Sequence, residues 1–196
     1  MASELIAAFA LMASPAVPAP APVPTLAQFE AVLRRHDSAT LALEEWCALR
    51  QIARPAAVTA RVLAPAEAPT RLPTAPGPHH DPARKLELKD GEAVTLRNVS
   101  LSCGGTVLSV AWNWYVPARL SREMNEALRS SQAPFGKVVA PLGFRRRPLS
   151  IVAGPARGCP ADTISTHEAM LVLPDGTPLA YLVECYTAAN LEPLPR

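Results

Sequence analysis

The spacing of apolar residues divides the chain into a helical first part and a strand-rich second part. The first apolar residues at helical spacing are Leu26, Phe29, Val32 and Leu33. Thr25 and Gln28 form a capping box in front of them, which predicts a helix start. Ser38 is suited to cap a second helix, and Arg54-Pro55 indicates where that helix has ended. The apolar face expected for the second helix holds Leu41, Ala42, Trp46 and Leu49.

Alternation of apolar and polar residues predicts strands further along the chain. The predicted strands are residues 58–63, 93–103, 107–116, 144–152, 168–173 and 178–187. Gly104-Gly105 and the segment 174–177 join two pairs of them as hairpins. Ser121 is expected to cap a short helix that ends near Arg129. Consecutive hairpins with helices mainly at the front predict an α+β domain, an antiparallel β-sheet with helices packed on one face.

Proline makes up 22 of the 196 residues, roughly twice the usual share, and it is concentrated in two segments. Residues 64–84 contain too many prolines for a helix or a central strand, so a long loop is expected. Residues 15–24 alternate Pro with Ala and Val, which predicts a stiff, extended linker. The organisation expected is therefore an apolar, Pro-rich segment 1–24 followed by a single domain over 25–190.

Residues 5–13 are apolar but too few to span a bilayer, so no membrane span is expected. Their length fits the apolar part of a secretory signal, and Ser14-Pro15-Ala16 fits a cleavage site. Glu4 and the lack of Lys or Arg in front of this stretch speak against export. We favour an exported, periplasmic protein; the alternative is a cytoplasmic protein with an apolar N-terminal helix.

The charge composition argues against a nucleic-acid partner. The formal net charge is only +2, and 5% of the residues are aromatic. The one tight basic cluster is Arg145-Arg146-Arg147, in a predicted strand. We expect this cluster to be a solvated strand edge that discourages sheet-to-sheet aggregation, with capture of an anion as the second interpretation.

No cofactor and no metal are expected. His79-His80-Asp81 lies in the Pro-rich loop, and His36 and His167 are distant in sequence. Neither His-x3-His nor Cys-x2-Cys spacing occurs. His167 is expected to be a structural histidine with its hydrogen bonds made.

Four cysteines, Cys47, Cys103, Cys159 and Cys185, allow three disulfide connectivities. In an exported protein one or two disulfides are expected. In a cytosolic protein, Cys103 and Cys185 would be small buried strand residues.

Two charges inside otherwise apolar strands are the main candidates for chemistry. Arg97 shares a strand face with Val99, Leu101 and Cys103, and Glu184 is the only charge in residues 179–186. A buried charge is costly unless it is paired. One interpretation is that Arg97 and Glu184 pair with each other or reach the sheet rim. The other is a dry cavity for a planar anion, in which arginine grips a carboxylate and glutamate accepts a hydrogen bond from a ligand hydroxyl.

Four segments, in this order, resemble chorismate lyase and the wider chorismate lyase-like fold, which includes the UTRA ligand-sensing domains of bacterial repressors. They are Asp37-Ser38-Ala39-Thr40, residues 96–103 followed by two glycines, Pro134-Phe135-Gly136-Lys137, and residues 182–187. The resemblance covers about residues 26 to 190. It implies the fold and, for the enzymes, elimination of pyruvate from chorismate to give 4-hydroxybenzoate without a metal or organic cofactor.

The resemblance also assigns roles to residues. Arg97 would bind the ring carboxylate of the substrate, and Glu184 would contact the ring hydroxyl or ether oxygen; these two are the candidate catalytic residues. Phe135, beside Gly136, would offer a backbone N–H, so the candidate substrate-binding residues are Arg97, Phe135, Gly136 and Glu184. Such chemistry depends on positioning and electrostatic preorganisation rather than on a nucleophile.

The chain departs from the family pattern at two positions. Asn113 stands where the lyases carry a second arginine, and Ala39 replaces a larger apolar residue. Two functions follow as hypotheses. The first is a lyase acting on chorismate or a related cyclic carboxylate. The alternative is a non-catalytic binding module for a small aromatic carboxylate.

Overall fold

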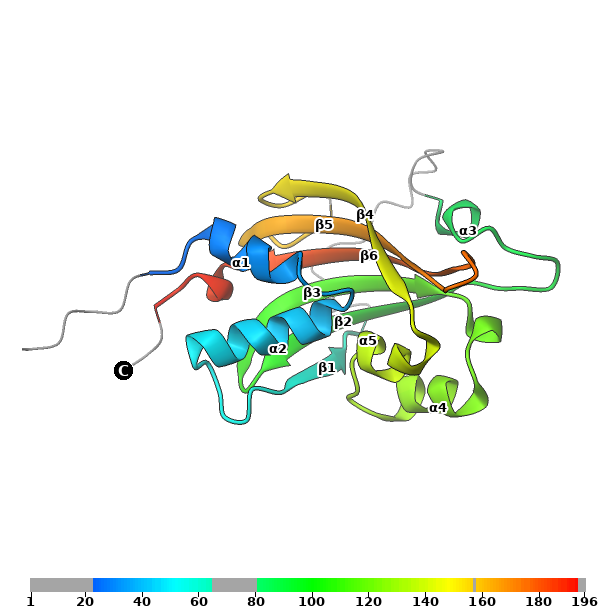
Figure 1. The fold of residues 1–196 in the computed structure, drawn as a ribbon, viewed down its shortest axis with the longest axis horizontal. Coiled ribbons are helices and arrows are strands. Elements are labelled where there is room, and N and C mark those ends of the chain that lie inside the picture. The colour runs from blue at the N-terminus through cyan, green and yellow to red at the C-terminus, as the bar shows by residue number, and fades with distance from the viewer. Residues whose placement is uncertain (1–22, 65–80, 157, 194–196) are drawn as a thin grey trace, which may run out of the picture.

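The computed structural model describes residues 23–64, 81–156 and 158–193, and its centre is a six-stranded antiparallel sheet (Figure 1). The strands are β1 (Val58–Val62), β2 (Thr95–Cys103), β3 (Thr106–Tyr115), β4 (Arg145–Ala153), β5 (Thr163–Val172) and β6 (Pro178–Thr187). They lie in the order β1-β2-β3-β6-β5-β4. The hairpins β2–β3 and β5–β6 therefore meet at the centre, through β3 and β6. The predicted α+β class and the antiparallel sheet are confirmed.

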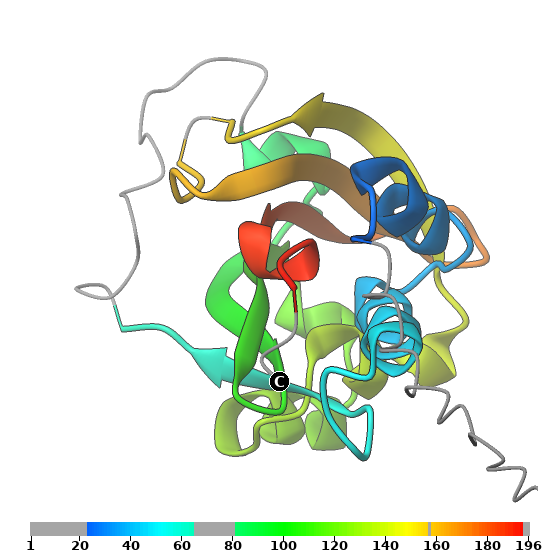
Figure 2. The ribbon, with the colours of Figure 1, turned by 90° about the vertical axis from the view of Figure 1, so that its left-hand side faces the viewer.

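The larger helices of the described chain lie against one side of this sheet (Figures 1 and 2). They are α1 (Leu26–Leu33), α2 (Ala39–Arg50) and α4 (Arg122–Ser130), and the single turn α5 (Phe135–Val138) lies on the same side. Short 3-10 turns are formed by Pro117–Arg119, Ala140–Leu142 and Ala188–Asn190. The capping box of Thr25 and Gln28 is present, and the Ser121 side chain caps α4 by accepting from the Met124 N–H. Both predicted helix starts are confirmed.

The buried face of α2 differs from the predicted one. Ala42 and Trp46 are buried as expected, but Leu41 is 47% and Leu49 61% exposed. The buried stripe runs instead through Ala42, Leu43, Trp46 and Cys47. The neighbours of α2 decide which of its faces is buried. Trp46 packs on Phe29 of α1 with their ring centroids 5.2 Å apart, and Cys47 forms a disulfide with Cys103 at the end of β2.

Most of the two proline-rich segments lies outside the described residues. Of the expected loop 64–84, residues 65–80 are outside, as are residues 1–22 of the N-terminal segment. The end of the loop differs from the prediction, because Pro82–Lys85 forms a short helix, α3. Asp81 caps it, and Pro82 occupies the first turn, where proline is tolerated because its missing N–H has no helical partner anyway.

The apolar core lies on both faces of the sheet. On the side of α1 and α2, one cluster surrounds Phe29, Trp46 and Tyr186, and a second one surrounds Phe135, Phe144 and Leu182. The opposite face buries Trp112, while Trp114 stacks on Tyr181 at 5.3 Å. Leu86, which follows α3, packs on this opposite face. Apolar clusters thus cover both faces of the sheet. Polar side chains of the sheet can form a site only where two of these clusters are separated.

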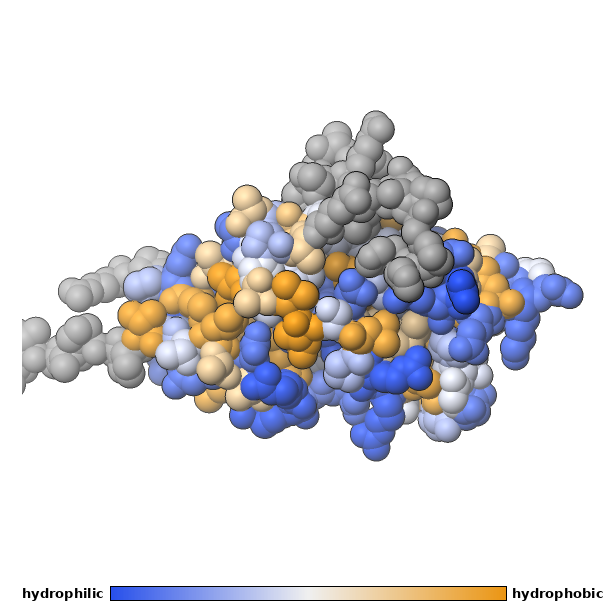
Figure 3. Space-filling view, turned by 90° about the horizontal axis from the view of Figure 1, so that it is seen from above, coloured by the Kyte–Doolittle hydropathy of each residue, from blue (hydrophilic) through white to orange (hydrophobic). Residues whose placement is uncertain are grey.

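The edge strand β4 is the most exposed strand of the described sheet. Hydrophobic and hydrophilic residues lie side by side on the face seen in Figure 3. The exposed large apolar residues of β4 are Leu149, Ile151 and Val152. Arg145 and Arg147 are exposed, as a solvated strand edge predicts. Arg146 is not.

Candidate functional site

A small cavity separates the two apolar clusters on the helix-facing side of the sheet. Its volume is about 30 Å³, enough for about two water molecules. Its polar lining residues are Asp37, Ser38, Thr40, Asn113, Arg146 and Glu184. Apolar walls come from Leu101, Ala111, Phe135, Phe144, Leu171 and Leu182, and Gly136 lies at the surface of the cavity. Segments far apart in the sequence therefore meet here.

The sequence-predicted site residues lie on the same side of the sheet. Arg97 and Glu184 are only 5% and 3% exposed. Arg97 lies opposite Asn113, which lies opposite Leu182; Glu184 is two residues further along β6, and so it shares the face of Leu182. Glu184, Phe135 and Gly136 line the cavity directly. Arg97 is not among the lining residues, but its cross-strand neighbour Asn113 is.

Glu184 does not pair with Arg97. Arg146 of β4 donates to both carboxylate oxygens of Glu184, with Nη1 at 3.1 Å from Oε1 and Nη2 close to Oε2. The Tyr186 hydroxyl donates to Glu184 Oε2 at 3.0 Å. The expectation of an Arg97–Glu184 pair is therefore wrong, because another cation already occupies both oxygens.

Arg146 differs from the solvated residue that was expected. Its side chain is 10% exposed, since it turns inward across β5 to reach β6. Burial lowers the pKa of Arg146, but the facing Glu184 carboxylate outweighs this, and the pKa is raised. Arg146 is thus a charged member of the site, held by a bidentate carboxylate contact.

Asp37 connects the segment between α1 and α2 to the same strand. Its carboxylate accepts from the Arg146 backbone N–H at 2.8 Å and from Arg145 Nη1 at 2.9 Å. Burial raises the pKa of Asp37, yet these contacts hold it below its ordinary value of 3.8. We call this set of contacts, Asp37 with Arg145 and Arg146, the Asp37 latch. It holds the start of α2 over the cavity.

Arg97 is a buried cation with almost no partner. Its single hydrogen bond to a described residue runs from Nη2 to the Ala133 carbonyl oxygen, at 3.3 Å. Nε and Nη1 are buried without a hydrogen-bond partner. Burial lowers the pKa of Arg97, and nearby Tyr115 offsets part of that effect. Such unmade hydrogen bonds are expensive in a folded protein and call for an explanation.

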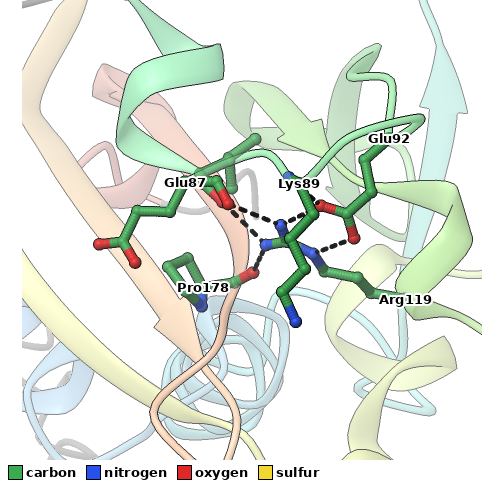
Figure 4. Close-up of polar contacts among 6 residues, drawn as sticks. Glu87, Lys89, Glu92, Arg119 and Pro178 are labelled. Atoms are coloured by element: carbon green, nitrogen blue, oxygen red, sulfur yellow. Dashed lines mark hydrogen bonds and ion pairs between the residues drawn. The ribbon is translucent and has the colours of Figure 1, made fainter.

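Arg119 shows what a structural buried arginine looks like in this fold (Figure 4). Nη1 donates to the carbonyls of Leu86, at 2.8 Å, and Pro178, and Nη2 donates to the Glu87 carbonyl at 3.2 Å. Nε and Nη2 also hold the Glu92 carboxylate. All three nitrogens of this guanidinium donate hydrogen bonds, and together they join residues 86–92 to the start of β6. The contrast identifies Arg97 as the functional candidate.

A second group at the cavity also lacks a partner. Ser38 is the N-cap residue of α2, but its side chain makes no cap hydrogen bond, and its Oγ is buried without a partner. The first backbone N–H groups of a helix have no partner within the helix. Gly136 packs closely against Ser38, because a Cβ at Gly136 would lie 2.5 Å from Ser38 Oγ. Ser38, at the start of α2, therefore lines the cavity with a hydroxyl group that makes no hydrogen bond.

His167 is a structural histidine, as predicted. Its Nε2 lies 3.1 Å from Ser165 Oγ, and its ring packs edge-on against Tyr186. Burial lowers the pKa of His167. Across the residues that the structure describes, no group of three or more His, Cys, Asp or Glu side chains is placed to hold a metal ion. His79 and His80 lie outside those residues.

All four cysteines are paired. Cys47 bonds to Cys103, and Cys159 bonds to Cys185, which leaves no free thiol. The first disulfide fixes α2 to β2 next to the site. Among the described helices, none has both the length and the apolar character to cross a bilayer.

Comparison with solved structures supports the fold. PhnF from Mycobacterium smegmatis aligns with a TM-score of 0.50 and 14% identity over 80% of this chain. YydK from Bacillus subtilis, a possible transcriptional regulator, aligns at 0.44 and 18% over 71% of this chain. The ligand-binding domain of a putative GntR-family regulator from Bordetella bronchiseptica aligns at 0.43 and 20%, over 67% of this chain and 83% of its own. The chain spans 66% of PhnF and 62% of YydK.

The alignment with PhnF, together with the sheet order and the helices on one face, places the chain in the α+β class with a chorismate lyase-like fold. No family model matches the sequence. The chain is 33% identical over 181 residues to the uncharacterized protein y4mC of Sinorhizobium fredii, an alignment that covers 83% of this chain and 73% of the relative. It belongs to the y4mC family.

Proposed function

We propose that the protein is a binding module for a small aromatic or cyclic carboxylate, held at Arg97 and the start of α2. The observation that carries this proposal is the buried guanidinium of Arg97, whose Nε and Nη1 have no partner. A planar carboxylate supplies two acceptor oxygens in the geometry that a guanidinium prefers. A bound anion would neutralise a charge that otherwise weakens the fold.

The walls of the cavity suit a flat apolar ring. Leu101, Leu182, Phe135 and Phe144 surround its polar groups. Ligand sites of this type combine mostly apolar walls with a few placed polar groups. Because the cavity holds only about 30 Å³, a ring can enter only when its walls move apart. The Asp37 latch is one contact that resists such a movement.

The second candidate function is a carbon–oxygen lyase acting on chorismate or a related cyclic carboxylate. It is favoured by the presence of both Arg97 and Glu184 in buried positions on one face. Against it, both oxygens of Glu184 accept hydrogen bonds from Arg146. Incubation of the purified protein with chorismate tests it: release of pyruvate and 4-hydroxybenzoate above the uncatalysed rate supports the lyase, and its absence leaves the binding module.

Calorimetric titration with 4-hydroxybenzoate and benzoate tests the binding module. We expect saturable binding by the wild type and at least a tenfold loss of affinity in Arg97→Met. The matched control is Arg147→Ala, which removes the same charge from an exposed position of β4. Binding that is equally weak in both variants, or unchanged in Arg97→Met, contradicts the proposal.

We also propose that the protein matures in an oxidising compartment, as an exported protein does. The pairing of Cys47 with Cys103 and of Cys159 with Cys185 supports this, because disulfides persist mainly outside the reducing cytosol. Thiol titration of protein isolated from its native cells without reductant, after denaturation, tests it. We expect no reactive thiol, and four thiols per chain would contradict the proposal.

A further inference from the structure

The arginines in and beside the cavity differ in whether a carboxylate matches their charge. At the end formed by β4 and β6, the positive charge of Arg146 is matched at contact distance by Glu184. Asp37 adds a second carboxylate there, on the backbone N–H of Arg146. A ligand group that approaches this end meets two carboxylates, Glu184 and Asp37, each already paired with an arginine, so no cation is free there.

Arg97 lies opposite Asn113 of the cavity lining, and its charge is unmatched by any described carboxylate. The other polar side chains that line the cavity are neutral: they are the Ser38 and Thr40 hydroxyls and the Asn113 amide. The other nearby cations are engaged, since Lys137 pairs with Glu44 and Arg145 with Asp37. Within the described chain, Arg97 is therefore the one cation near the site that can neutralise a negative charge of a ligand.

We infer that the site selects ligands with a single carboxylate and rejects dianions, with Arg146 and Glu184 acting as the specificity-determining pair. This inference rests on the proposed function. A ligand whose far end carries a hydroxyl can hydrogen-bond to Ser38, Asn113 or Glu184. A ligand whose far end carries a second carboxylate places it near Glu184 and Asp37, whose arginine partners are already engaged, so its charge finds no free cation. Asn113 of the cavity lining is neutral, and the charge of Arg146 is matched by Glu184.

Two probes that differ only at the far end test this inference. 4-Hydroxybenzoate carries one carboxylate and a para hydroxyl, and terephthalate replaces that hydroxyl by a second carboxylate. By calorimetry at neutral pH, we expect the wild type to bind 4-hydroxybenzoate at least tenfold more tightly than terephthalate. Equal affinity, or tighter binding of terephthalate, overturns the inference but leaves the proposed function standing. Failure of the wild type to bind either probe overturns the proposed function itself.

The Glu184→Gln variant tests the role of the pair. Without the opposing carboxylate, Arg146 has an unmatched charge, so the preference should shift toward terephthalate by at least tenfold. The matched control is Glu168→Gln, which removes a carboxylate bonded to Tyr181 in the neighbouring strand β5 and should leave the preference unchanged. An unchanged preference in a folded Glu184→Gln protein overturns the inference.

A second variant covers the case in which Glu184→Gln does not fold. Arg146→Gln with Glu184→Gln removes both charges at once, so the part of the cavity formed by β4 and β6 still has no free cation. We expect the double variant to keep the preference for 4-hydroxybenzoate within about threefold of the wild type. Preference for terephthalate in the double variant contradicts the inference.

Discussion

Arg146 of β4 holds the carboxylate of Glu184 of β6 with two hydrogen bonds, although β5 lies between the two strands. The contact crosses the helix-facing side of the sheet at the cavity. It joins an edge strand to a central strand by side chains alone. Both side chains are buried, at 10% and 4% exposure. The pair therefore affects the stability of the fold and also lines the cavity.

Removing one partner of this pair should cost stability, and removing both should restore most of it. Arg146→Met leaves the Glu184 charge buried without its counter-charge, which typically costs about 3–5 kcal/mol of unfolding free energy. Arg146→Met with Glu184→Leu replaces the pair by apolar groups, so we expect a loss of less than half as much. Urea denaturation of the three proteins measures both values. Equal losses in the single and double variants would show that the ion pair itself is not what the single variant disturbs.

The sequence was sufficient for the fold class and for part of the site. Capping residues, alternation and turn residues predicted most helices and strands, because these signals are local. The burial of Arg97 and Glu184 followed from the apolar residues that surround each of them in its strand. Successive residues of a strand point to opposite faces, so Arg146 lies on the face opposite Arg145 and Arg147. Its burial could not be predicted, because it depends on the carboxylate of Glu184, 38 residues away in the sequence.

The orientation of α2 could not be predicted for a similar reason. Four apolar residues, Leu41, Ala42, Trp46 and Leu49, defined one plausible face, and only contacts with α1 and β2 select another. Disulfide pairing was equally open, since four cysteines allow three connectivities. What the sequence lacked in each case was the long-range partner.

Removing the charge of Arg97 should stabilise the ligand-free protein while it abolishes binding. Arg97→Met replaces a buried cation with unmade hydrogen bonds by an apolar side chain of similar length, so we expect a gain of about 1–3 kcal/mol. Thermal and urea unfolding without ligand measure this. Arg119→Met is the comparison, and it should lose stability because Glu92 and three carbonyl groups lose their donor. If Arg97→Met is destabilised as Arg119→Met is, Arg97 is structural.

The Arg119–Glu92 contact should make stability depend on pH in the acid range. The hydrogen bonds from Arg119 lower the pKa of Glu92 from 4.5 to about 2. A carboxyl with a lowered pKa in the folded state contributes stability above pH 4.5, and this contribution disappears as the pH falls from 4.5 toward 2.

Comparison of the wild type with Glu92→Gln by urea unfolding between pH 7 and pH 2.5 tests this dependence. We expect the wild type to be the more stable protein at pH 7 and the difference to shrink steadily below pH 4.5. Glu126→Gln, on the exposed surface of α4, is the control and should show a small difference at every pH. A difference between wild type and Glu92→Gln that stays constant over this range contradicts the assignment.

Filling the space beside Gly136 should weaken ligand binding with little loss of stability. A methyl group there would lie 2.5 Å from Ser38 Oγ, while the next nearest atoms, Thr40 Oγ1 and Ser38 Cβ, are at 3.4 and 3.5 Å. The Ser38 hydroxyl can rotate away, and alanine suits a helix better than glycine does, so we expect Gly136→Ala to cost less than about 1 kcal/mol. Because the methyl group and the displaced hydroxyl both enter a cavity of about 30 Å³, affinity for 4-hydroxybenzoate should fall at least tenfold.

Gly105→Ala, where an added Cβ meets no atom within 4 Å, is the matched control and should bind as the wild type does. Unchanged affinity in Gly136→Ala would place the ligand elsewhere than between α2, α5 and the sheet.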